Sequence, residues 1–515
     1  MTQSSETYSS SPHERNAAHA DTQPSTGVTI DGLTFTRYGD DRLREECGVF
    51  GIFNHPDAAA ITALGLHALQ HRGQEASGIV SYDGRKFHSE RRMGLVGDNF
   101  SKAHVLERLR GRMAIGHNRY STTGDPLIRN VQPLFCDIDT GGFAVAHNGN
   151  LTNALTIRHD LISSGAICHS TSDTEVILHL LSRSKKRRTV ERLIDAIRQV
   201  EGSYALVCLT NDVMIGARDP IGIRPLVIGR LGHAYVLASE TCALDIVGAE
   251  FVREVENGEV VVITDEGLES HRPFPKRAAR PCIFEYIYFS RPDSIVGGRT
   301  VYEIRRAMGT QLAREAPAIA DVVVPIPDSG VPAAIGFSRE SGIPFELGII
   351  RNHYVGRTFI EPEQRIRQLG VKLKHSANSS VIKGNRVILI DDSVVRGTTS
   401  KKIVQLIRDA GAAEVHMRIS SPPITHPDFY GIDTPSKRDL LAANMDLEGM
   451  RAFMDADSLA FLSVNGIYRS IGVEGRDDRS PQFTDHCFTG DYPTELTDQS
   501  GESPPRQLSL LAEVG

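Results

Sequence analysis

Apolar runs and helical periodicities fill the chain from about residue 47 onward. The alternation of small and apolar residues over Cys47–Phe53 is typical of a strand packed closely against other backbone. Five further apolar runs predict strands, at 79–82, 112–116, 143–147, 204–209 and 234–239. Helical periodicity covers 57–70 and 173–184. The first half is therefore predicted to combine several strands with helices.

The second half contains a strand of a different kind. Val387–Ile390 is a run of branched apolar residues, which predicts a buried strand of a parallel sheet. Asp391 and Asp392 follow where this strand should end, and a helical pattern covers Lys401–Ala410. Between them, Arg396–Ser400 supplies a flexible glycine, three hydroxyls and a run of backbone N–H groups. A helix N-terminus, with free N–H groups and a positive dipole end, favours an anion such as phosphate.

The acidic pair beside this phosphate-binding pattern suggests a sugar phosphate. Asp391 and Asp392 could hold sugar hydroxyls, or a hard cation through oxygen ligands, at the carboxyl end of a parallel sheet. The alternative is an ordinary strand–turn–helix whose acids are solvated. The full run of acids, Arg396, Gly397 and hydroxyls is more specific and favours a binding site.

A second strand-to-helix unit precedes this one in the chain. Val322–Val324 predicts a strand, Asp328-Ser329-Gly330 forms a tight loop, and a helix of small residues follows. The N–H groups and the hydroxyl of the loop suit pyrophosphate. Residues 351–375 are basic and have little apolar periodicity, so they predict a loop.

Composition describes an ordinary globular protein. The chain has 515 residues, of which 40% are hydrophobic and 23% charged. The net charge of −7 argues against a nucleic-acid partner, and no apolar stretch is long enough for a transmembrane helix. The seven cysteines contain no C-x-x-C pair, so neither a disulfide framework nor a zinc site is predicted. Without an apolar signal core, we expect a cytoplasmic location and no membrane partner.

Cys47 is followed by several polar clusters. A single cysteine in an apolar setting is usually a small buried hydrophobic residue. Here, however, polar clusters follow at 71–78, 116–122, 147–149 and 172–175. Each one follows or interrupts an apolar run, as loop-borne functional residues do. We interpret His71 and His117, which lie in two of these clusters, as hydrogen-bonding residues rather than ligands.

Together with Cys47–Ile52, these clusters resemble the class II glutamine amidotransferases. The resemblance implies an α+β N-terminal-nucleophile sandwich (αββα), with two antiparallel sheets between helical layers. It also implies that residues 1–46 are a propeptide, removed by proteolysis, and that Cys47 becomes the N-terminus. The free α-amino group, with a reference pKa of about 8, could then take the thiol proton. Residues 1 to about 28 are polar and predict disorder.

The same resemblance implies roles for four more residues. The Asn148 amide and the Gly149 N–H would form the oxyanion hole. Arg119 would pair with the α-carboxylate of glutamine, and Asp173 would accept from its α-ammonium group. A structural ion pair is the alternative for Arg119 and Asp173, and spacing alone favours it.

The run Asp391–Ser400 resembles the signature of the type I phosphoribosyltransferases, which bind 5-phosphoribosyl 1-pyrophosphate (PRPP). This resemblance implies an α/β parallel-sheet phosphoribosyltransferase domain in which residues 351–375 close over PRPP and exclude water. The PRPP ligands that it implies are Asp328, Ser329, Gly330, Lys374, Asp391, Asp392, Arg396, Gly397, Thr398 and Thr399. Mg²⁺ is expected on Ser329, Asp391 and Asp392.

The order of the two halves resembles the amidophosphoribosyltransferase family from about Cys47 to Tyr492. The resemblance implies that a Cys47 thioester releases ammonia from glutamine. This ammonia then displaces pyrophosphate from PRPP and gives 5-phosphoribosylamine for purine synthesis. AMP and GMP as feedback inhibitors and a homotetramer are also implied. The expected divisions are a leader at 1–46, an amidotransferase domain at 47–275, a phosphoribosyltransferase domain at 276–480 and a C-terminal segment at 481–515.

Some members of this family carry a [4Fe–4S] cluster on four cysteines. Cys282 and Cys487 occupy two of those positions here, and Asp428 and Thr484 occupy the others, so no cluster is expected. Two alternative functions remain. Another class II amidotransferase with a different synthase domain is disfavoured by the 387–400 motif. A non-catalytic PRPP-sensing regulator is disfavoured by the complete set of residues around Cys47.

Overall fold

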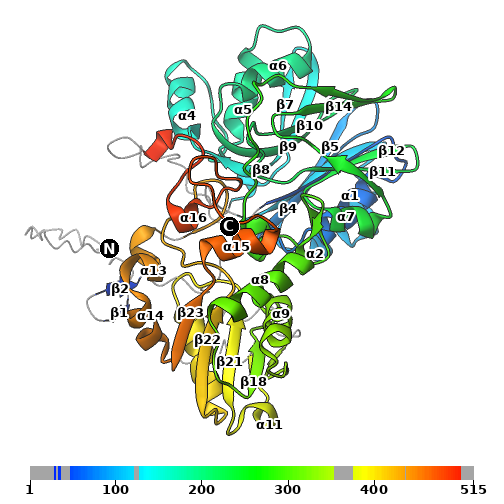
Figure 1. Ribbon diagram of the computed structural model, residues 1–515. Helices are drawn as coiled ribbons and strands as arrows, with labels where there is room; N and C mark the ends of the chain where they lie inside the picture. Colours follow the sequence, from blue (N-terminus) through cyan, green and yellow to red (C-terminus); the bar gives the residue numbers. More distant parts are fainter. Residues whose placement is uncertain are drawn as a thin grey trace, which may run out of the picture. The chain divides into compact units, whose positions relative to one another are not determined.

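The computed structural model describes residues 28–30, 33–35, 47–120, 127–352, 375–434 and 436–499. The chain divides into two units, Met1–Asp40 and Asp41–Gly515. In the first unit, the described residues form a hairpin of β1 (Val28–Ile30) and β2 (Leu33–Phe35). Both predicted functional halves belong to the second unit (Figure 1). The prediction of disorder over residues 1 to about 28 falls outside the described residues except for Val28, and the segment in which leader cleavage is predicted lies outside them.

The first half contains two antiparallel sheets. The seven-stranded sheet has the order β13-β11-β12-β3-β6-β4-β5, and the six-stranded sheet has the order β15-β14-β10-β9-β8-β7. Their strands are β3 Gly48–Phe53, β4 Ala76–Tyr82, β5 Phe87–Met93, β6 Met113–Arg119, β7 Leu134–Ile138, β8 Gly141–Leu151, β9 Gly202–Leu209, β10 Met214–Arg218, β11 Val227–Leu231, β12 Ala234–Ala238, β13 Glu250–Glu254, β14 Val260–Thr264 and β15 Gly267–His271.

Helices cover the outer faces of both sheets (Figure 1). They are α1 Ala58–Ala68, α2 Val96–Phe100, α3 Ala103–Leu106, α4 Ala154–Ser163, α5 Glu175–Arg183, α6 Thr189–Ile197 and α7 Thr241–Val247. Val49 and Val207 fill the space between the sheets, whereas Phe50, on the other face of β3, packs with α1 and α7. On the six-stranded sheet, Leu206 packs with α5 and α6. The predicted αββα sandwich is confirmed.

The second half is built on a parallel sheet with the order β18-β21-β22-β23. Its strands are β18 Val322–Pro325, β21 Arg386–Asp391, β22 Glu414–Ile419 and β23 Ser458–Phe461. The helices on its two faces are α8 Val301–Glu315, α9 Val331–Ser341, α12 Thr398–Asp409, α14 Leu447–Met454 and α15 Val464–Ile471. Ile388 packs with α8, α9 and α15, and Leu389 packs with α12 and α14. Because both faces are covered, the apolar run needs no polar alternation, and the predicted α/β sheet is confirmed.

Short elements complete the described chain. They are the 3₁₀ turns Ile128–Asn130, Lys437–Asp439 and Thr497–Gln499, a π-helical turn Glu285–Phe289, β16 Ile295–Val296, β17 Arg299–Thr300, β19 Ile349–Arg351, β20 His375–Ala377, α11 Ser379–Ile382, α13 Leu441–Asn444 and α16 His486–Thr489. No helix among the described residues has the length and apolarity that a membrane crossing requires.

Three predicted details were wrong. Helix α12 begins at Thr398 rather than Lys401, because Gly397 caps it with a φ of 75°, so the three hydroxyls lie in its first turn. The glycine- and proline-rich run Gly216–Pro225 predicts a turn between strands, but its first three residues belong to β10, which continues to Arg218. The polar residues at 116–119 and 147–149 lie within β6 and β8 rather than on loops.

Candidate active sites

Cys47 is a buried thiol directly before β3. Its Sγ donates to the carbonyl of Tyr120 at 3.5 Å, and its own carbonyl accepts from Arg72 Nε at 3.3 Å. Burial raises the pKa of the thiol to about 11, although the positive charge of Arg119 acts in the opposite direction. A thiol in this setting is neutral at pH 7, so it needs a base before it can act as a nucleophile.

Two of the predicted glutamine ligands lie around this thiol. Arg119 ends β6, and Asp173 lies just before α5; both are buried, and both act electrostatically on Cys47. Asp173 Oδ2 accepts from the backbone N–H of Leu151 in β8 at 3.0 Å. The three predicted residues therefore surround one site that also includes the end of β8.

The predicted oxyanion hole contains a buried amide with unmet hydrogen-bonding capacity. Asn148 is fully buried, and among the described residues neither its amide nitrogen nor its amide oxygen has a hydrogen-bond partner. Leaving such a group unpaired costs about 1–3 kcal/mol, which suggests that a ligand pairs with it. The next residue, Gly149, has a φ of 138°, and a Cβ there would lie 2.2 Å from the carbonyl oxygen of Ser203. Only glycine fits this position.

Hydrogen bonds to other protein groups hold His71 and His117, the two histidines interpreted above as structural. His71 Nε2 lies 2.7 Å from Glu240 Oε1, and His117 Nε2 lies 3.0 Å from the carbonyl oxygen of His147. Burial lowers the pKa of His117 to about 3, so the ring is neutral at physiological pH. These contacts agree with a structural role for both.

The two predicted PRPP loops follow neighbouring parallel strands, β18 and β21 (Figure 1). Carboxyl ends of parallel strands share one edge of a sheet, where ligands of such folds bind. The first loop packs against the end of β21: a Cβ at Gly330 would lie 2.4 Å from the carbonyl oxygen of Ile390. Asp328 forms an ion pair with Arg351 of β19. Lys374 and most of the predicted closing loop lie outside the described residues.

The acidic pair forms the polar part of a small cavity at this edge. Asp392 N donates to Asp391 Oδ1 at 3.0 Å, and Ser393 Oγ donates to Asp392 Oδ1 at 2.9 Å. Asp392 Oδ2 is buried and has no hydrogen-bond partner in the described parts of the chain. Tyr288 and Thr399 also line the cavity. A buried carboxylate oxygen in this state fits a hard cation such as Mg²⁺ or a ribose hydroxyl.

A buried network of charged groups, which the sequence analysis did not assign, starts beside Cys47. Arg72 Nη1 and Nη2 donate to Glu285 at 3.0 and 2.8 Å, and Nη1 also donates to Glu240 at 2.6 Å. All three side chains are almost fully buried. Ser290 continues the network, because its Oγ donates to Glu285 and its carbonyl accepts from Arg305 Nη2 at 2.8 Å.

The other end of this network is Arg305 of α8, whose charge interacts with that of Asp392. Burial lowers the pKa of Arg305 to about 10, and the charge of Asp392 acts against this shift. A chain of buried hydrogen bonds therefore runs from the Cys47 carbonyl through Arg72, Glu285 and Ser290 to Arg305. Glu285 interrupts the apolar run Cys282–Phe289, and this signal could have identified it, whereas Arg72 is one of several polar residues in the cluster at 71–78.

Further contacts join β8, the strand that carries Asn148, and its neighbour β9 to the second half of the chain. Asn150 Nδ2 donates to the Phe429 carbonyl at 2.9 Å, and Ser203 Oγ donates to the Tyr430 carbonyl at 2.6 Å. The backbone of Gly431 packs against Gly149, since a Cβ at Gly431 would lie 3.3 Å from the Gly149 Cα. The strand that carries Asn148 therefore lies directly against the phosphoribosyltransferase half.

The four positions that could hold an iron–sulfur cluster lie near one another. Cys282 and Thr484 form a β-bridge, and Asp428 and Cys487 place ligand atoms within 4.8 Å of each other. His486 Nε2 lies 2.8 Å from Asp428 Oδ1. Burial raises the pKa of the Cys282 thiol to about 11. Two thiols, one hydroxyl and a carboxylate paired with a histidine do not fit a cluster that requires four thiolates.

The fold and these sites define a glutamine amidotransferase joined to a phosphoribosyltransferase. Family models agree with this class: one described as a glutamine amidotransferase domain matches residues 117–245, and one described as a phosphoribosyl transferase domain matches residues 298–420.

Similar proteins identify the family. The amidophosphoribosyltransferase of Rhizobium etli is 62% identical over 481 residues, which cover 92% of this chain and 97% of that protein. The amidophosphoribosyltransferase of Bacillus subtilis is 49% identical over 455 residues, which cover 88% of this chain and 95% of that protein.

Solved structures agree with these relatives. The structure of the B. subtilis glutamine PRPP amidotransferase complexed with ADP and GMP has a TM-score of 0.83 and 48% identity, and covers 87% of this chain and 98% of its own. A structure described as the allosteric regulatory enzyme of purine biosynthesis has a TM-score of 0.84 and 48% identity, and covers 89% and 98%. The chain belongs to the amidophosphoribosyltransferase family. It is a glycosyltransferase of purine biosynthesis with glutamine amidotransferase activity.

Proposed function

We propose that the residues identified above convert glutamine, PRPP and water to 5-phosphoribosylamine, glutamate and pyrophosphate. This reaction would be the first committed step toward IMP. The observation that carries the assignment of the sites is that each contains a buried polar group with no hydrogen-bond partner among the described residues. The Asn148 amide suits the oxyanion of a thioester-forming step, and Asp392 Oδ2 suits a ribose hydroxyl or a cation.

In the glutamine site, the α-amino group of a processed Cys47 takes the thiol proton. The thiolate attacks the side-chain amide of glutamine, and Asn148 and the Gly149 N–H stabilise the resulting oxyanion. The C–N bond then breaks, ammonia leaves with a proton returned from the amino group, and water hydrolyses the thioester to glutamate. Arg119 and Asp173 hold the α-carboxylate and the α-ammonium group of the substrate.

In the PRPP site, the first turn of α12 holds the 5′-phosphate, through Gly397, Thr398 and Thr399, with Arg396 beside them. The loop Asp328-Ser329-Gly330 and Lys374 hold the pyrophosphate. Ammonia forms a bond to ribose C1 as the bond to pyrophosphate breaks. Ser329, Asp391 and Asp392 would hold Mg²⁺, which supplies charge neutralisation for the leaving pyrophosphate when bound.

Nucleotide inhibitors, a cellular location, a quaternary state and domain boundaries are also proposed. AMP and GMP act as feedback inhibitors, and the relative complexed with ADP and GMP supports nucleotide binding. The chain acts in the cytoplasm, in agreement with seven free cysteines. Its proposed quaternary state is a homotetramer. The proposed domains are 47–275 and 276–480, and β15, the last strand of the two large antiparallel sheets, ends before the boundary between them.

The proposal also includes the absence of a [4Fe–4S] cluster. Assays of iron and acid-labile sulfide, with a visible spectrum of anaerobically purified protein, should give the values of a metal-free protein. About four irons and four sulfides per chain would contradict it.

Paired variants test the assignment of the sites. Cys47→Ser should lose phosphoribosylamine formation from glutamine and keep it from free ammonia. Asp392→Asn should weaken both reactions by a similar factor, because it acts on PRPP. Glutamine-dependent turnover that survives in Cys47→Ser would exclude this nucleophile, and an ammonia reaction unaffected by Asp392→Asn would exclude that ligand.

A further inference from the structure

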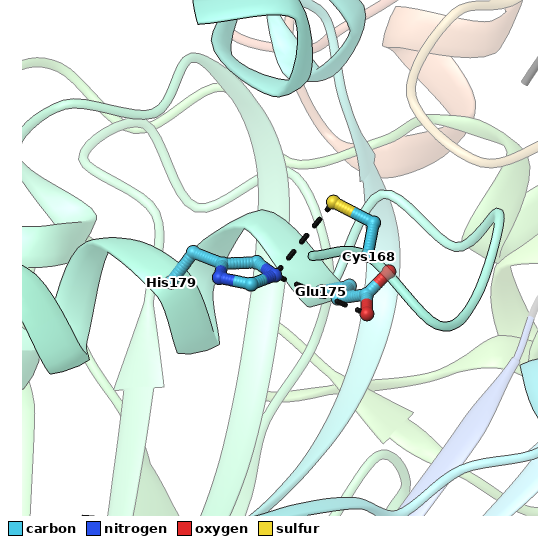
Figure 2. Close-up of side chains that lie close together, drawn as sticks. All are labelled: Cys168, Glu175 and His179. Carbon is cyan, nitrogen blue, oxygen red and sulfur yellow. Dashed lines mark hydrogen bonds and ion pairs between the residues drawn. The ribbon is translucent and has the colours of Figure 1, made fainter. Parts of the chain in front are cut away.

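Three potential metal ligands converge at the start of α5, and the reaction uses none of them. Cys168 lies on the loop before the helix, and Glu175 and His179 lie on the helix itself (Figure 2). Cys168 Sγ is 3.7 Å from His179 Nε2, and Glu175 Oε1 is 4.0 Å from the same nitrogen. The three ligand atoms all lie within 4.8 Å of one another.

Helix geometry and hydrogen bonds to Glu175 position these residues even when no metal is bound. Glu175 and His179 are four residues apart on α5 and therefore share one face of the helix. Glu175 also holds the loop that carries Cys168, because its Oε1 accepts from the N–H of His169 at 2.6 Å and its Oε2 accepts from the N–H of Ser170 at 3.0 Å. Arg158 contacts Oε2 rather than Oε1, at 3.3 Å. Oε1 accepts from the His169 N–H, and its second lone pair can bind another partner.

The donor set has the chemistry of a zinc-type site. A thiolate, an imidazole and a carboxylate are the side chains that bind Zn²⁺. Metal–sulfur and metal–nitrogen bonds of about 2.3 and 2.0 Å at a tetrahedral centre put sulfur and nitrogen about 3.5 Å apart, close to the separation of Cys168 and His179.

Water can reach the position that these ligands leave open. A cavity of about 990 Å³ lies beside the helix, and His169, Ser170, Glu175 and His179 are among the residues that line it. Two of the three ligands therefore face solvent-filled space. A cation there would keep a coordination position for water or a small anion, as three-ligand zinc sites do.

We propose that Cys168, Glu175 and His179 bind a divalent cation of the zinc class. The bond forms between the cation and the Cys168 sulfur, the thiol proton goes to solvent, and no group is oxidised or reduced. The bound cation ties the loop 168–174 to α5. A cysteine count could not reveal this site, because it contains one cysteine and its ligands have no C-x-x-C spacing.

Cobalt(II) provides a direct probe, because a thiolate bound to Co²⁺ gives a charge-transfer band in the near ultraviolet. Titration of the metal-free, full-length protein with Co²⁺ should give this band with one equivalent, and Zn²⁺ should remove it. Cys168→Ser should abolish the band. His179→Gln should weaken Co²⁺ binding by about 100-fold or more, since even residues behind the ligands of a metal change affinity 10–100-fold.

Two other cysteines serve as controls. Cys136 is partly buried and lines the same cavity, so Cys136→Ser is a matched control that should keep the band. Cys47→Ser should also keep it. A band that disappears in either control, that persists in Cys168→Ser, or that never forms would overturn the proposal.

A measurement on the unmodified chain removes any dependence on how well the variants fold. Zn²⁺ should slow the alkylation of Cys168 by iodoacetamide at least tenfold and leave Cys136 unaffected, as measured by peptide mass spectrometry. Equal rates at Cys168 with and without Zn²⁺ would also overturn the proposal.

Discussion

The glutamine site and the PRPP site are built on sheets of opposite kinds. Arg119 and Asn148 lie within antiparallel strands and are 4% and 0% exposed. Asp392 and Gly397 instead lie on the loop and helix cap that follow a parallel strand, and the Asp328 side chain is 58% exposed. The glutamine site is thus part of a core, whereas the PRPP site lies at the edge of a sheet.

This difference determines how substitutions should act. A core position has neighbours on every side, so changes at the glutamine site that remove contacts with the fold affect stability as well as catalysis. At the edge of a parallel sheet, the chain can change without disturbing the packed layers. Four substitutions or conditions test this contrast.

The largest effect is expected for Arg72→Met, in the buried network of charged groups that starts beside Cys47. The substitution leaves Glu240 and Glu285 buried without their shared guanidinium, and breaking such pairs costs about 3–5 kcal/mol. Denaturant unfolding should measure this loss. The matched control is Arg314→Met, which removes an exposed pair with Glu340 and should cost about 1 kcal/mol or less. Equal losses in both variants would contradict a special role for the buried network.

The loss in Arg72→Met should also depend on pH. Burial alone would raise the pKa of Glu285, but Arg72 reverses this effect and the pKa lies below its usual value. A lowered pKa contributes stability above the ordinary glutamate value, and this stability disappears as the pH falls through the folded-state value. The stability difference between wild type and Arg72→Met should therefore shrink as the pH falls below about 4.5.

Asn148→Ala should have the next largest effect, and only on the reaction with glutamine. Loss of one oxyanion donor lowers kcat by about 10²–10³-fold. Because Asn148 has no protein partner among the described residues, its removal breaks no hydrogen bond of the fold described here. Steady-state kinetics with glutamine and with ammonia would separate the two reactions. An equal decrease in both would place Asn148 outside the oxyanion hole.

A smaller effect is expected in the pH dependence of Cys47 alkylation, which tests how the thiol of the glutamine site is ionised. With residue 46 still attached, burial raises the thiol pKa to about 11, so its alkylation should accelerate by about tenfold per pH unit between pH 7 and 10. Once the leader is removed, the α-amino group can accept the proton, and the rate should level off near pH 8. Mass spectrometry of the Cys47 peptide measures both rates. A plateau near pH 8 in leader-bearing protein would show that the amino group is unnecessary.

The same contrast explains which features could be predicted from the sequence. The PRPP loops are contiguous, so Asp391–Thr399 carries its chemistry in one run. The glutamine site draws Arg119, Asn148 and Asp173 from separate elements, and only the family resemblance connected them. Arg72 was missed because it lies in a polar cluster like any other. Glu285 interrupts an apolar run, but nothing local connects it with a partner 213 residues away. The start of α12 was misplaced because the conformation of Gly397, rather than any periodicity, sets it.

The smallest expected effect concerns the cap of the phosphate-binding helix. Gly397 and Gly384 both have left-handed φ values, 75° and 78°, so alanine at either position should cost about 1–2 kcal/mol of backbone strain. A Cβ at Gly384 meets no atom within 4 Å, whereas one at Gly397 would lie 2.6 Å from Leu441 Cδ2. Gly384→Ala therefore measures strain alone. Gly397→Ala should lose more stability and also raise KM for PRPP in the ammonia-dependent reaction, because α12 must shift. If the two variants have the same KM for PRPP, the position of the α12 N-terminus does not determine phosphate binding.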